Sequence, residues 1–266
     1  MAQQESDAQT GMATPAALRR FISAALAEQR IGLALQPIVQ SRAPDRVAFC
    51  EGLIRLLDRQ GRPMTAGMFI GAAEGSALGS ALDCRALSLG LDALAVDPGL
   101  RLSINISAQT TEDAEWHRIL EQGLARDATL AERLILEITE RSMIDRVDRM
   151  AAFVLRMQRL GLSVALDDFG SGYTSFRHFK DIRFDILKID GIFTRAIHSD
   201  ADNRALVRSM RDVAQHFEML CVAECVETPQ EAACLSDLGI DALQGFHFGR
   251  PTLRDLPSEQ VGQYSA

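Results

Sequence analysis

Apolar runs of strand length alternate with amphipathic stretches along the last two thirds of the chain. The apolar runs contain mostly Leu, Ile and Val, and they lie at residues 102–107, 134–139, 162–168, 186–190, 222–226 and 242–245. Runs that are apolar on both faces are typical of parallel strands covered by helices. Between them, apolar residues recur at helical spacing at 114–125, 144–160, 203–217 and 229–238, with a shorter helix predicted at 174–180. The alternation predicts consecutive βαβ units.

The first third of the chain has a different order of elements. Residues 15–30 have helical spacing and predict an opening helix, whereas residues 33–39 and 47–57 predict two strands. Because only a short connection separates these strands, they could pair antiparallel. From residue 64 to about 95 the pattern is helical, with a predicted break near Gly79.

These elements fit one barrel better than one open sheet. Roughly eight strand–helix units in 266 residues match an α/β barrel of the TIM-like (β/α)8 type. An open doubly wound sheet is the alternative, but the sequence lacks its usual GxGxxG turn after the first strand. Residues 15–260 are therefore expected to form a single domain. Residues 1–14 are polar and rich in Gln and Ala, and we expect them to be a disordered tail.

Nearly every predicted strand carries one polar or ionised side chain near its carboxyl-terminal half. These residues are Glu51, Asn105, Glu137, Asp167, Lys188, Glu224 and Gln244. An unpaired buried ion costs several kcal/mol, whereas a whole domain is stable by only about 5–15 kcal/mol. One lysine cannot neutralise so many carboxylates, so they require a shared countercharge, and divalent cations are the obvious candidates. For any one of these residues taken singly, a satisfied polar group in the core is the alternative.

The types of donor narrow the choice of metal. Carboxylates and an Asn carbonyl are hard oxygen donors, which suit Mg²⁺ or Mn²⁺. The histidines lie outside these strand positions, apart from His247 at the margin, which disfavours a zinc site of the His/Cys kind.

The predicted strand 162–168 ends in two adjacent carboxylates, Asp167 and Asp168, ahead of the glycines Gly170 and Gly172. Acidic residues at the carboxyl end of a strand, followed by a glycine turn, lie where α/β enzymes place their catalytic residues. Because side chains alternate along a strand, at most one of the two can point straight into the barrel, and the other leans over its rim. The alternative is that Asp168 caps a following helix.

Charge and cysteine content restrict the partners and the compartment. The net charge of −8 argues against binding to duplex nucleic acid or to an anionic membrane, although bound metal ions could still attract an anionic ligand. The five cysteines show no CxxC spacing, no secretory signal is visible, and no apolar run is long enough to span a bilayer. We therefore expect reduced thiols in a cytoplasmic protein.

Eight short motifs occur in the order found in a known family. They are Gln36-Pro37-Ile38, Glu51-Gly52-Leu53-Ile54-Arg55, Asn105-Ile106-Ser107, Glu137-Ile138-Thr139-Glu140, Asp167-Asp168-Phe169-Gly170-Ser171-Gly172-Tyr173, Lys188-Ile189-Asp190, Ala223-Glu224-Cys225-Val226-Glu227-Thr228 and Gln244-Gly245. From about Leu33 to Pro251 the chain resembles the EAL domain, a cyclic di-GMP phosphodiesterase module. Any one motif is a weak signal, but eight in order are a strong one.

The resemblance implies a role for each matching residue. The implied ligands of two Mg²⁺ or Mn²⁺ ions are Glu51, Asn105, Glu137, Asp167, Asp168 and Glu224, with Asp167 bridging. The implied catalytic residues are Lys188, which would hold the attacking water, together with Glu224 and Glu51. The implied substrate contacts are Gln36, Leu53, Arg55 and Gln244, with Arg55 on phosphate. The implied reaction is in-line attack by water that opens cyclic di-GMP to linear pGpG.

The resemblance also implies a barrel whose first strand is antiparallel and a homodimer. Two alternatives to hydrolysis stay open at this point: a receptor that binds cyclic di-GMP without cutting it, and another Mg²⁺-dependent barrel enzyme of an enolase-like or aldolase-like kind. The sequence departs from the family pattern at Gly52, where the family has Ala, and at Cys225, where it has Gly. If position 225 requires a positive φ, the cysteine is strained and could shift Glu224; if it is ordinary strand, the cysteine simply packs.

Overall fold

The computed structural model describes residues 14–143, 147–172 and 176–254. The predicted disordered tail lies outside the described residues, apart from Thr14, whose side chain caps the first helix by accepting from the Ala17 N–H. The last six residues of the predicted domain, 255–260, also lie outside them. The statements below concern the described part of the chain.

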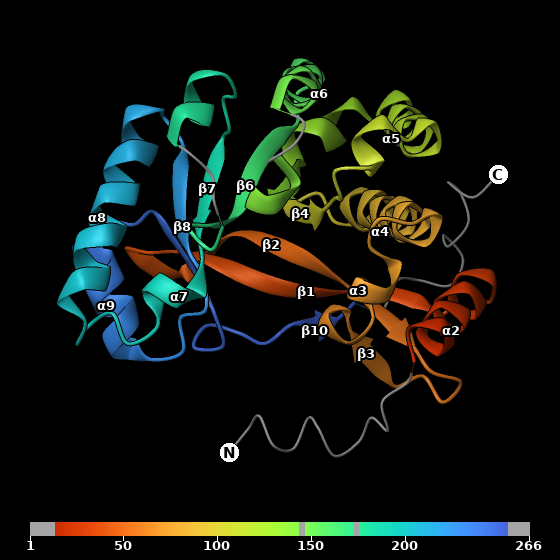
Figure 1. Ribbon diagram of the computed structural model, residues 1–266, viewed down its shortest axis with the longest axis horizontal. Coiled ribbons are helices and arrows are strands. Elements are labelled where there is room, and N and C mark those ends of the chain that lie inside the picture. Colours follow the sequence, from red (N-terminus) through yellow and green to blue (C-terminus); the bar gives the residue numbers. More distant parts are fainter. Residues whose placement is uncertain (1–13, 144–146, 173–175, 255–266) are drawn as a thin grey trace.

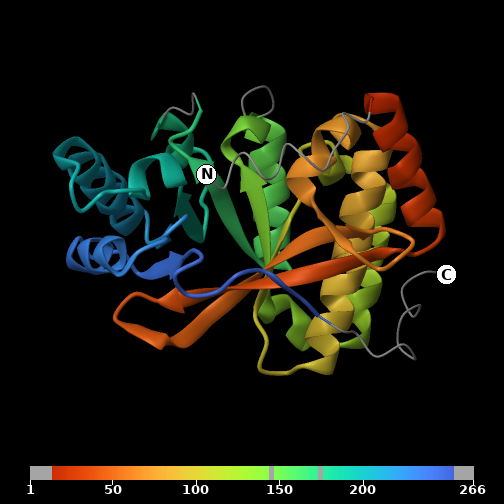
Figure 2. The same cartoon turned by 90° about the horizontal axis from the view of Figure 1, so that it is seen from below.

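Eight strands close into a barrel, which confirms the predicted TIM-like fold. In chain order they are β1 (Ile31–Gln40), β2 (Ala43–Leu57), β4 (Leu102–Asn105), β5 (Leu134–Thr139), β6 (Ser163–Phe169), β7 (Ile186–Ile189), β8 (Leu220–Ala223) and β9 (Ala242–Gln244). From β2 to β9 each strand pairs parallel with the next, and β1 closes the barrel between β9 and β2. β1 is antiparallel to both of these neighbours, as expected. Figure 2 shows β1 and β2 as one long hairpin.

Helices surround the strands (Figure 1). They are α2 (Pro15–Ala27), α3 (Ile70–Ala73), α4 (Ala77–Val96), α5 (Ala114–Arg126), α6 (Val147–Arg159), α7 (Gly191–Thr194), α8 (Ala201–His216) and α9 (Pro229–Asp237). The predicted helix at 174–180 is the short 3-10 segment η5 (Phe176–Lys180). Two short strands that the apolar pattern did not predict, β3 (Pro63–Thr65) and β10 (Thr252–Leu253), extend the sheet beyond the barrel on β2 and β1.

The helix break predicted near Gly79 is wrong, because α4 begins at Ala77 and runs through this glycine. The chain breaks earlier instead, at Glu74 to Ser76, where Gly75 has a φ of 67°. A Cβ added at Gly79 would lie 2.9 Å from the Ala73 carbonyl oxygen and 2.7 Å from Gln109 Nε2. This glycine therefore allows close packing inside a helix and does not end one.

The barrel interior contains two layers of side chains with opposite chemistry. The apolar layer consists of Ile38, Phe49, Ile135, Ala165, Ile186, Val222 and Ala242, which pack together as one buried cluster. The polar layer consists of Gln36, Glu51, Asn105, Glu137, Asp167, Lys188, Glu224 and Gln244. Apart from Asn105, each polar member lies two positions along the strand direction from an apolar member, so the two point to the same side of the sheet. A larger apolar core fills the space between strands and helices.

Candidate active site

Lys188 lies at the centre of the polar layer. Its Nζ is 2.7 Å from Glu224 Oε1, 2.8 Å from Asp167 Oδ1, 2.9 Å from Glu137 Oε2 and 3.8 Å from Glu51 Oε2. The Lys188 side chain is 1% exposed and that of Glu137 is fully buried, so these charges interact with little screening by water. One cation thus faces four carboxylates, and the layer retains an excess of negative charge.

Side-chain amides hold Glu51 from both sides. Asn105 Nδ2 donates to Glu51 Oε1 at 2.8 Å, and Gln244 Nε2 donates to Glu51 Oε2 at 2.6 Å. Gln244 Nε2 also lies 3.2 Å from Gln36 Oε1, and Gln36 Nε2 donates to the Gly249 carbonyl oxygen. The amides come from β1, β4 and β9, so the barrel itself orients the Glu51 carboxylate on β2.

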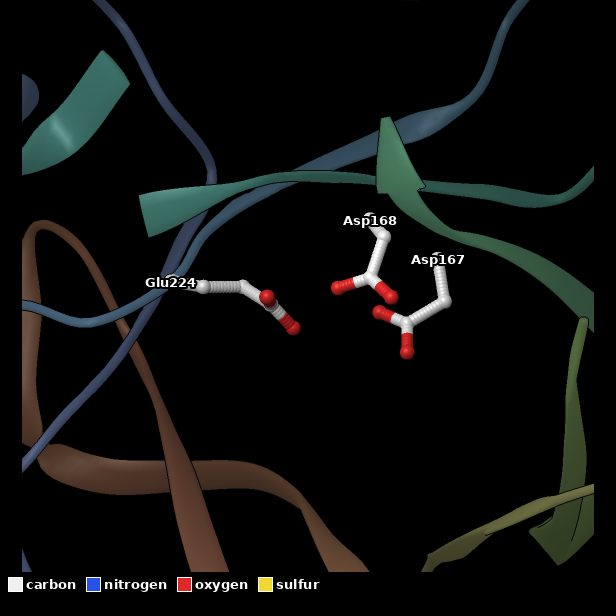
Figure 3. A group of neighbouring side chains, drawn as sticks. All are labelled: Asp167, Asp168 and Glu224. Carbon is white, nitrogen blue, oxygen red and sulfur yellow. The ribbon is translucent and has the colours of Figure 1, made fainter. Parts of the chain in front are cut away.

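Asp167 and Asp168 direct their carboxylates to the same place, although they are adjacent on β6. A regular strand would put them on opposite faces, but the pairing of β6 with β7 shifts register between Leu166 and Phe169, and Asp168 has a φ of 56°. Both carboxylates therefore approach Glu224, and ligand atoms of the three lie within 4.8 Å of one another (Figure 3). The Asp168 carboxylate belongs to this group, which favours a role in the site over the helix cap considered above.

Glu140 supports the turn that follows the aspartate pair. Its buried carboxylate accepts from the backbone N–H groups of Gly170 at 2.7 Å and Gly172 at 3.3 Å. Gly170 has a φ of 95°, and an added Cβ would collide with the Phe193 ring, so this position requires glycine. Tyr173, the last residue of the motif, lies outside the described residues.

The pKa values of three site carboxyls, Glu137, Asp168 and Glu224, are raised. Burial is the main cause for Glu137 and for Glu224, and Lys188 only partly offsets it. Burial, followed by the neighbouring Asp167 charge, raises the pKa of Asp168 to about 6. Burial would lower the pKa of Lys188, but its four carboxylate neighbours outweigh burial and hold that pKa well above its usual value. A divalent cation would remove this mutual repulsion of carboxylates.

The polar layer suits a hard divalent cation. Among the described residues, Glu137 Oε1 is buried without a well-aligned hydrogen bond. Asp167 Oδ1 lies 2.8 Å from Lys188 Nζ, but the geometry is not that of a hydrogen bond. Such acceptors are costly unless a cation satisfies them. Asp167, Asp168 and Glu224 offer converging oxygens, and Glu51, Asn105 and Glu137 adjoin them through Lys188 and the Asn105 hydrogen bond. An all-oxygen donor set favours Mg²⁺ or Mn²⁺.

A cavity of about 290 Å³ opens above the polar layer. Its lining residues are Gln36, Glu51, Leu53, Asp167, Asp168, Arg195, Glu224, Cys225, Glu227, Gln244, Gly245 and Phe246. Of the four predicted substrate contacts, Gln36, Leu53 and Gln244 line it. Arg55 is not among the lining residues; it is 8% exposed, and its guanidinium donates to the Ile54 carbonyl oxygen. Contact between Arg55 and substrate stays a prediction.

Position 225 has the positive φ that the family glycine would adopt freely. Cys225 has a φ of 56°, in the left-handed region that costs a residue with a Cβ about 1–2 kcal/mol. Its side chain packs against Gly191, where an added Cβ would lie 2.6 Å from Cys225 Sγ. Glu224 nevertheless reaches Lys188, so the cysteine does not remove Glu224 from the polar layer. The side chain at 225 and the glycine at 191 thus depend on each other.

Five residues near the site had no role in the sequence interpretation. They are Glu140, Arg195, Glu227, Glu231 and Phe246. Glu140 and Glu227 lie within the matched motifs, and Glu231 completes a Thr-x-x-Glu capping box with Thr228 that could have been recognised in the sequence. Arg195 and Phe246 carry no such signal, because their placement depends on how loops fold around the cavity.

The structure bears on the expected state of the cysteines and on membrane-spanning helices. All five cysteines are free, in keeping with the expected reduced thiols. In the part of the chain that the structure describes, no helix combines the length and the apolar character needed to cross a membrane.

Two of the similar sequences are named as cyclic di-GMP phosphodiesterases. The cyclic di-GMP phosphodiesterase PdeF of Escherichia coli (strain K12) is 31% identical over 239 residues, covering 88% of this chain and 32% of the relative. The cyclic di-GMP phosphodiesterase PdeB of Shewanella oneidensis is 31% identical over 235 residues, covering 86% of this chain and 27% of the relative. The chain thus spans about a third of the length of the curated relatives it matches.

Similar structures and a family model agree with these sequences. A structure described as the PaMucR phosphodiesterase in a c-di-GMP complex superposes with a TM-score of 0.80 at 29% identity, covering 92% of this chain and 99% of that chain. The FimX EAL domain from Pseudomonas aeruginosa, bound to c-di-GMP, has a TM-score of 0.81 at 21% identity over 90% of this chain and 98% of that chain, which supports the fold alone. The family model for the EAL domain matches residues 19–251. The chain belongs to the EAL domain family.

Proposed function

We propose that this chain is a metal-dependent phosphodiesterase that hydrolyses cyclic di-GMP to linear pGpG. The observation that carries the proposal is the polar layer, in which Lys188 contacts four carboxylates. Together with the adjoining Asp168, it contains every implied ligand and catalytic residue. The names of the relatives, and the c-di-GMP complex of a structure that this chain covers almost completely, support the substrate.

The polar layer and Asp168 supply two adjoining groups of ligands for two ions. Asp167, Asp168 and Glu224 would hold one ion, and Glu51, Asn105 and Glu137 would hold the other, with Asp167 shared. Bound Mg²⁺ or Mn²⁺ would lower the pKa of a nearby water and neutralise charge that develops on the phosphodiester.

The chain's own residues position the water and the substrate. Lys188 Nζ contacts four carboxylates and would orient a water bound among them for in-line attack on phosphorus. The water oxygen forms a bond to phosphorus as the P–O3′ bond breaks. The attacking water gives up one proton and the leaving 3′ oxygen takes up one, so the net reaction adds one water and yields a 5′-phosphate and a 3′-hydroxyl. Gln36 and Gln244 present amides at the cavity floor, and Leu53 gives a base or ribose an apolar contact.

The test is incubation of the purified protein with cyclic di-GMP and Mg²⁺ or Mn²⁺, with the products separated by chromatography. We expect linear pGpG in the presence of metal and none in EDTA. Glu51→Gln should lower turnover at least about a hundredfold, because a ligand that the barrel has oriented loses its charge. Glu132→Gln removes the same charge at an exposed position and should leave turnover unchanged. Tight binding without turnover would identify a receptor instead and overturn the proposal.

Homodimer formation and a cytoplasmic location stay predictions. Sedimentation equilibrium of the purified protein tests the first, since a single species of monomer mass over a wide concentration range would contradict it. Cell fractionation tests the second.

A further inference from the structure

A carboxylate from α4, outside the barrel, holds the turn that follows β4. Asp83 Oδ2 accepts from the Ser107 N–H at 2.9 Å, from Ser107 Oγ at 2.7 Å and from Thr110 Oγ1 at 2.6 Å. Ser107 comes two residues after Asn105, whose amide donates to Glu51. We propose that Asp83 is a positioning residue, which aims the Asn105 side chain by fixing the backbone beyond it. The proposal rests on the proposed function, in which Asn105 is a metal ligand.

The strand pairing that defines β4 ends where the metal ligand begins. On the β2 side the pairing reaches Ile104, and on the β5 side it reaches Asn105. One more hydrogen bond follows, from the Ile106 N–H to the Glu137 carbonyl oxygen at 3.0 Å. The next N–H, that of Ser107, donates to Asp83. Asp83 thus holds the chain to α4 at the first position where the sheet no longer does.

The same turn is attached to α4 at a second point. The helix packs beside β4 (Figure 1), and Gln109 Nε2 donates to the Ser76 carbonyl oxygen at 2.9 Å, at the start of the helix. A Cβ added at Gly79 would lie 2.7 Å from this nitrogen, so the glycine leaves the space that Gln109 occupies. The turn therefore has two attachments to one helix, and the Asp83 carboxylate is the one nearer to Asn105 in the chain.

A charged acceptor makes the attachment at Asp83 strong and directional. Hydrogen bonds to an ionised acceptor are shorter and roughly twice as strong as bonds between neutral groups. Three donors converge here on one oxygen, and the two hydroxyls, Ser107 Oγ and Thr110 Oγ1, also lie 2.9 Å from each other. Thr110 is fully buried. Because these donors share one oxygen, the place of that oxygen sets the course of the turn.

Asp83 can influence the proposed metal site only through the backbone. Neither Asp83 nor Thr110 lines the cavity above the polar layer, so they contact no substrate there. The route from Asp83 to the metal ions runs through Ser107 to the Asn105 side chain. A substitution at Asp83 should therefore lose its effect on metal binding once the Asn105 amide has been removed, whereas a loss of general stability would add to that removal.

The experiment measures Mn²⁺ affinity without substrate, from the EPR signal of free Mn²⁺, for the wild type, Asp83→Ala, Asn105→Ala and the double variant. Asp83→Ala should weaken Mn²⁺ binding about ten- to 100-fold, as expected for loss of a group that orients a ligand. In the Asn105→Ala background the same substitution should change the affinity by less than about twofold. At limiting Mn²⁺, Asp83→Ala should lower kcat with the KM for cyclic di-GMP little changed.

Two milder variants keep the test available if Asp83→Ala does not fold. Asp83→Asn retains a neutral acceptor oxygen and should recover part of the Mn²⁺ affinity. Thr110→Val replaces one hydroxyl by a methyl group of similar size, so the affinity should fall between those of the wild type and Asp83→Ala. Wild-type affinity in both of these variants would overturn the positioning role.

Asp185→Ala is the matched control. Asp185 Oδ2 likewise accepts from a backbone N–H, that of Val164 at 2.8 Å, and from Gln158 Nε2 at 3.0 Å. Asp185 directly precedes β7, so it lies at the opposite end of the parallel strands from Asn105. Its loss should lower the urea midpoint of unfolding, as the loss of Asp83 does, and should leave the Mn²⁺ affinity at the wild-type value.

The outcomes separate this proposal from the proposed function. An active wild type whose Mn²⁺ affinity survives Asp83→Ala, falls equally in Asp185→Ala, or falls further in the double variant than in Asn105→Ala overturns the positioning role alone. A wild type that binds Mn²⁺ without hydrolysing cyclic di-GMP, and loses affinity in Asp83→Ala as predicted, supports the positioning role and overturns the proposed function. A wild type that binds no Mn²⁺ overturns both.

Discussion

Ile135 and Glu137 point into the same barrel from the same strand, two residues apart, yet they belong to layers of opposite chemistry. Ile135 packs among apolar side chains from six other strands, and each of these contacts adds stability. Glu137 is fully buried, its pKa is raised by burial, and among the described residues one of its oxygens lacks a well-aligned hydrogen bond. Burial of the apolar layer stabilises the barrel, and this stability offsets the cost of holding like charges together in the polar layer. The difference locates the function at one end of the barrel.

The largest expected effect is on the charge balance of the polar layer. Lys188→Met keeps the side-chain length but leaves the surrounding carboxylates without a cation, so in EDTA it should lower the free energy of unfolding by about 3–5 kcal/mol. Mg²⁺ or Mn²⁺ should restore part of this loss, because the ion replaces the missing positive charge. Urea denaturation with and without metal measures both values.

The sequence provides a matched control for this variant, since its only other lysine is Lys180, which is exposed. Lys180→Met should leave the unfolding free energy within about 0.5 kcal/mol of wild type. A Lys188→Met protein as stable as wild type in EDTA would mean that the carboxylates are already neutral, contrary to our description of the layer.

A smaller loss of stability is expected when a buried carboxylate that is fully hydrogen-bonded, that of Glu231, is replaced. Burial alone would raise the pKa of Glu231, but backbone N–H groups of Ala196, Glu227 and Thr228 outweigh it and hold that pKa below its usual value. A lowered folded-state pKa means that the stabilisation is complete above the unfolded-state pKa and is lost as the pH falls through the folded-state pKa. Glu231→Gln should therefore cost about 1–3 kcal/mol at pH 7 and progressively less below about pH 4. A loss that is the same at pH 7 and pH 3, measured by urea denaturation, would contradict this.

The apolar layer should respond to truncation only through packing. Ile135→Val removes one methylene and should lower the free energy of unfolding by about 0.5–1.5 kcal/mol. Turnover per folded molecule should be unchanged, because no apolar-layer residue lines the cavity. A fall in kcat without a matching loss of folded protein would show that the two layers are not independent.

The smallest effect is expected at Cys225. Cys225→Gly relieves the left-handed backbone, but it also loses the packing of the thiol on Gly191 and increases the entropy of the unfolded chain. These contributions oppose each other, so the unfolding free energy should change by less than about 1 kcal/mol. Turnover should stay within about twofold of wild type, because Lys188 still holds the Glu224 carboxylate. A large gain in turnover would show that the cysteine displaces Glu224.

The barrel and the membership of the polar layer could be predicted because they depend on strand periodicity. Side chains two positions apart share a face, so one ionised residue in each of several parallel strands must meet the others. Periodicity could not predict the convergence of Asp167 with Asp168, which only the family resemblance implied, since it depends on a register shift and a positive φ within β6. The same holds for Glu231 on α9: its carboxylate accepts from the backbone N–H of Ala196 after α7, and no local sequence pattern predicts that contact. The helix break predicted near Gly79 was also wrong, because this glycine is needed for close packing inside α4.

The most direct test of the account is a Mn²⁺ titration of the wild type and Asp167→Asn, with bound metal and cyclic di-GMP hydrolysis measured on the same samples. Asp167 adjoins both groups of ligands, so its carboxylate should matter to every ion in the layer. The account predicts that bound Mn²⁺ and pGpG formation rise together in the wild type, and that Asp167→Asn loses at least about a hundredfold in turnover together with metal affinity. Hydrolysis that persists in EDTA, or Mn²⁺ binding that is undiminished in Asp167→Asn, would contradict it.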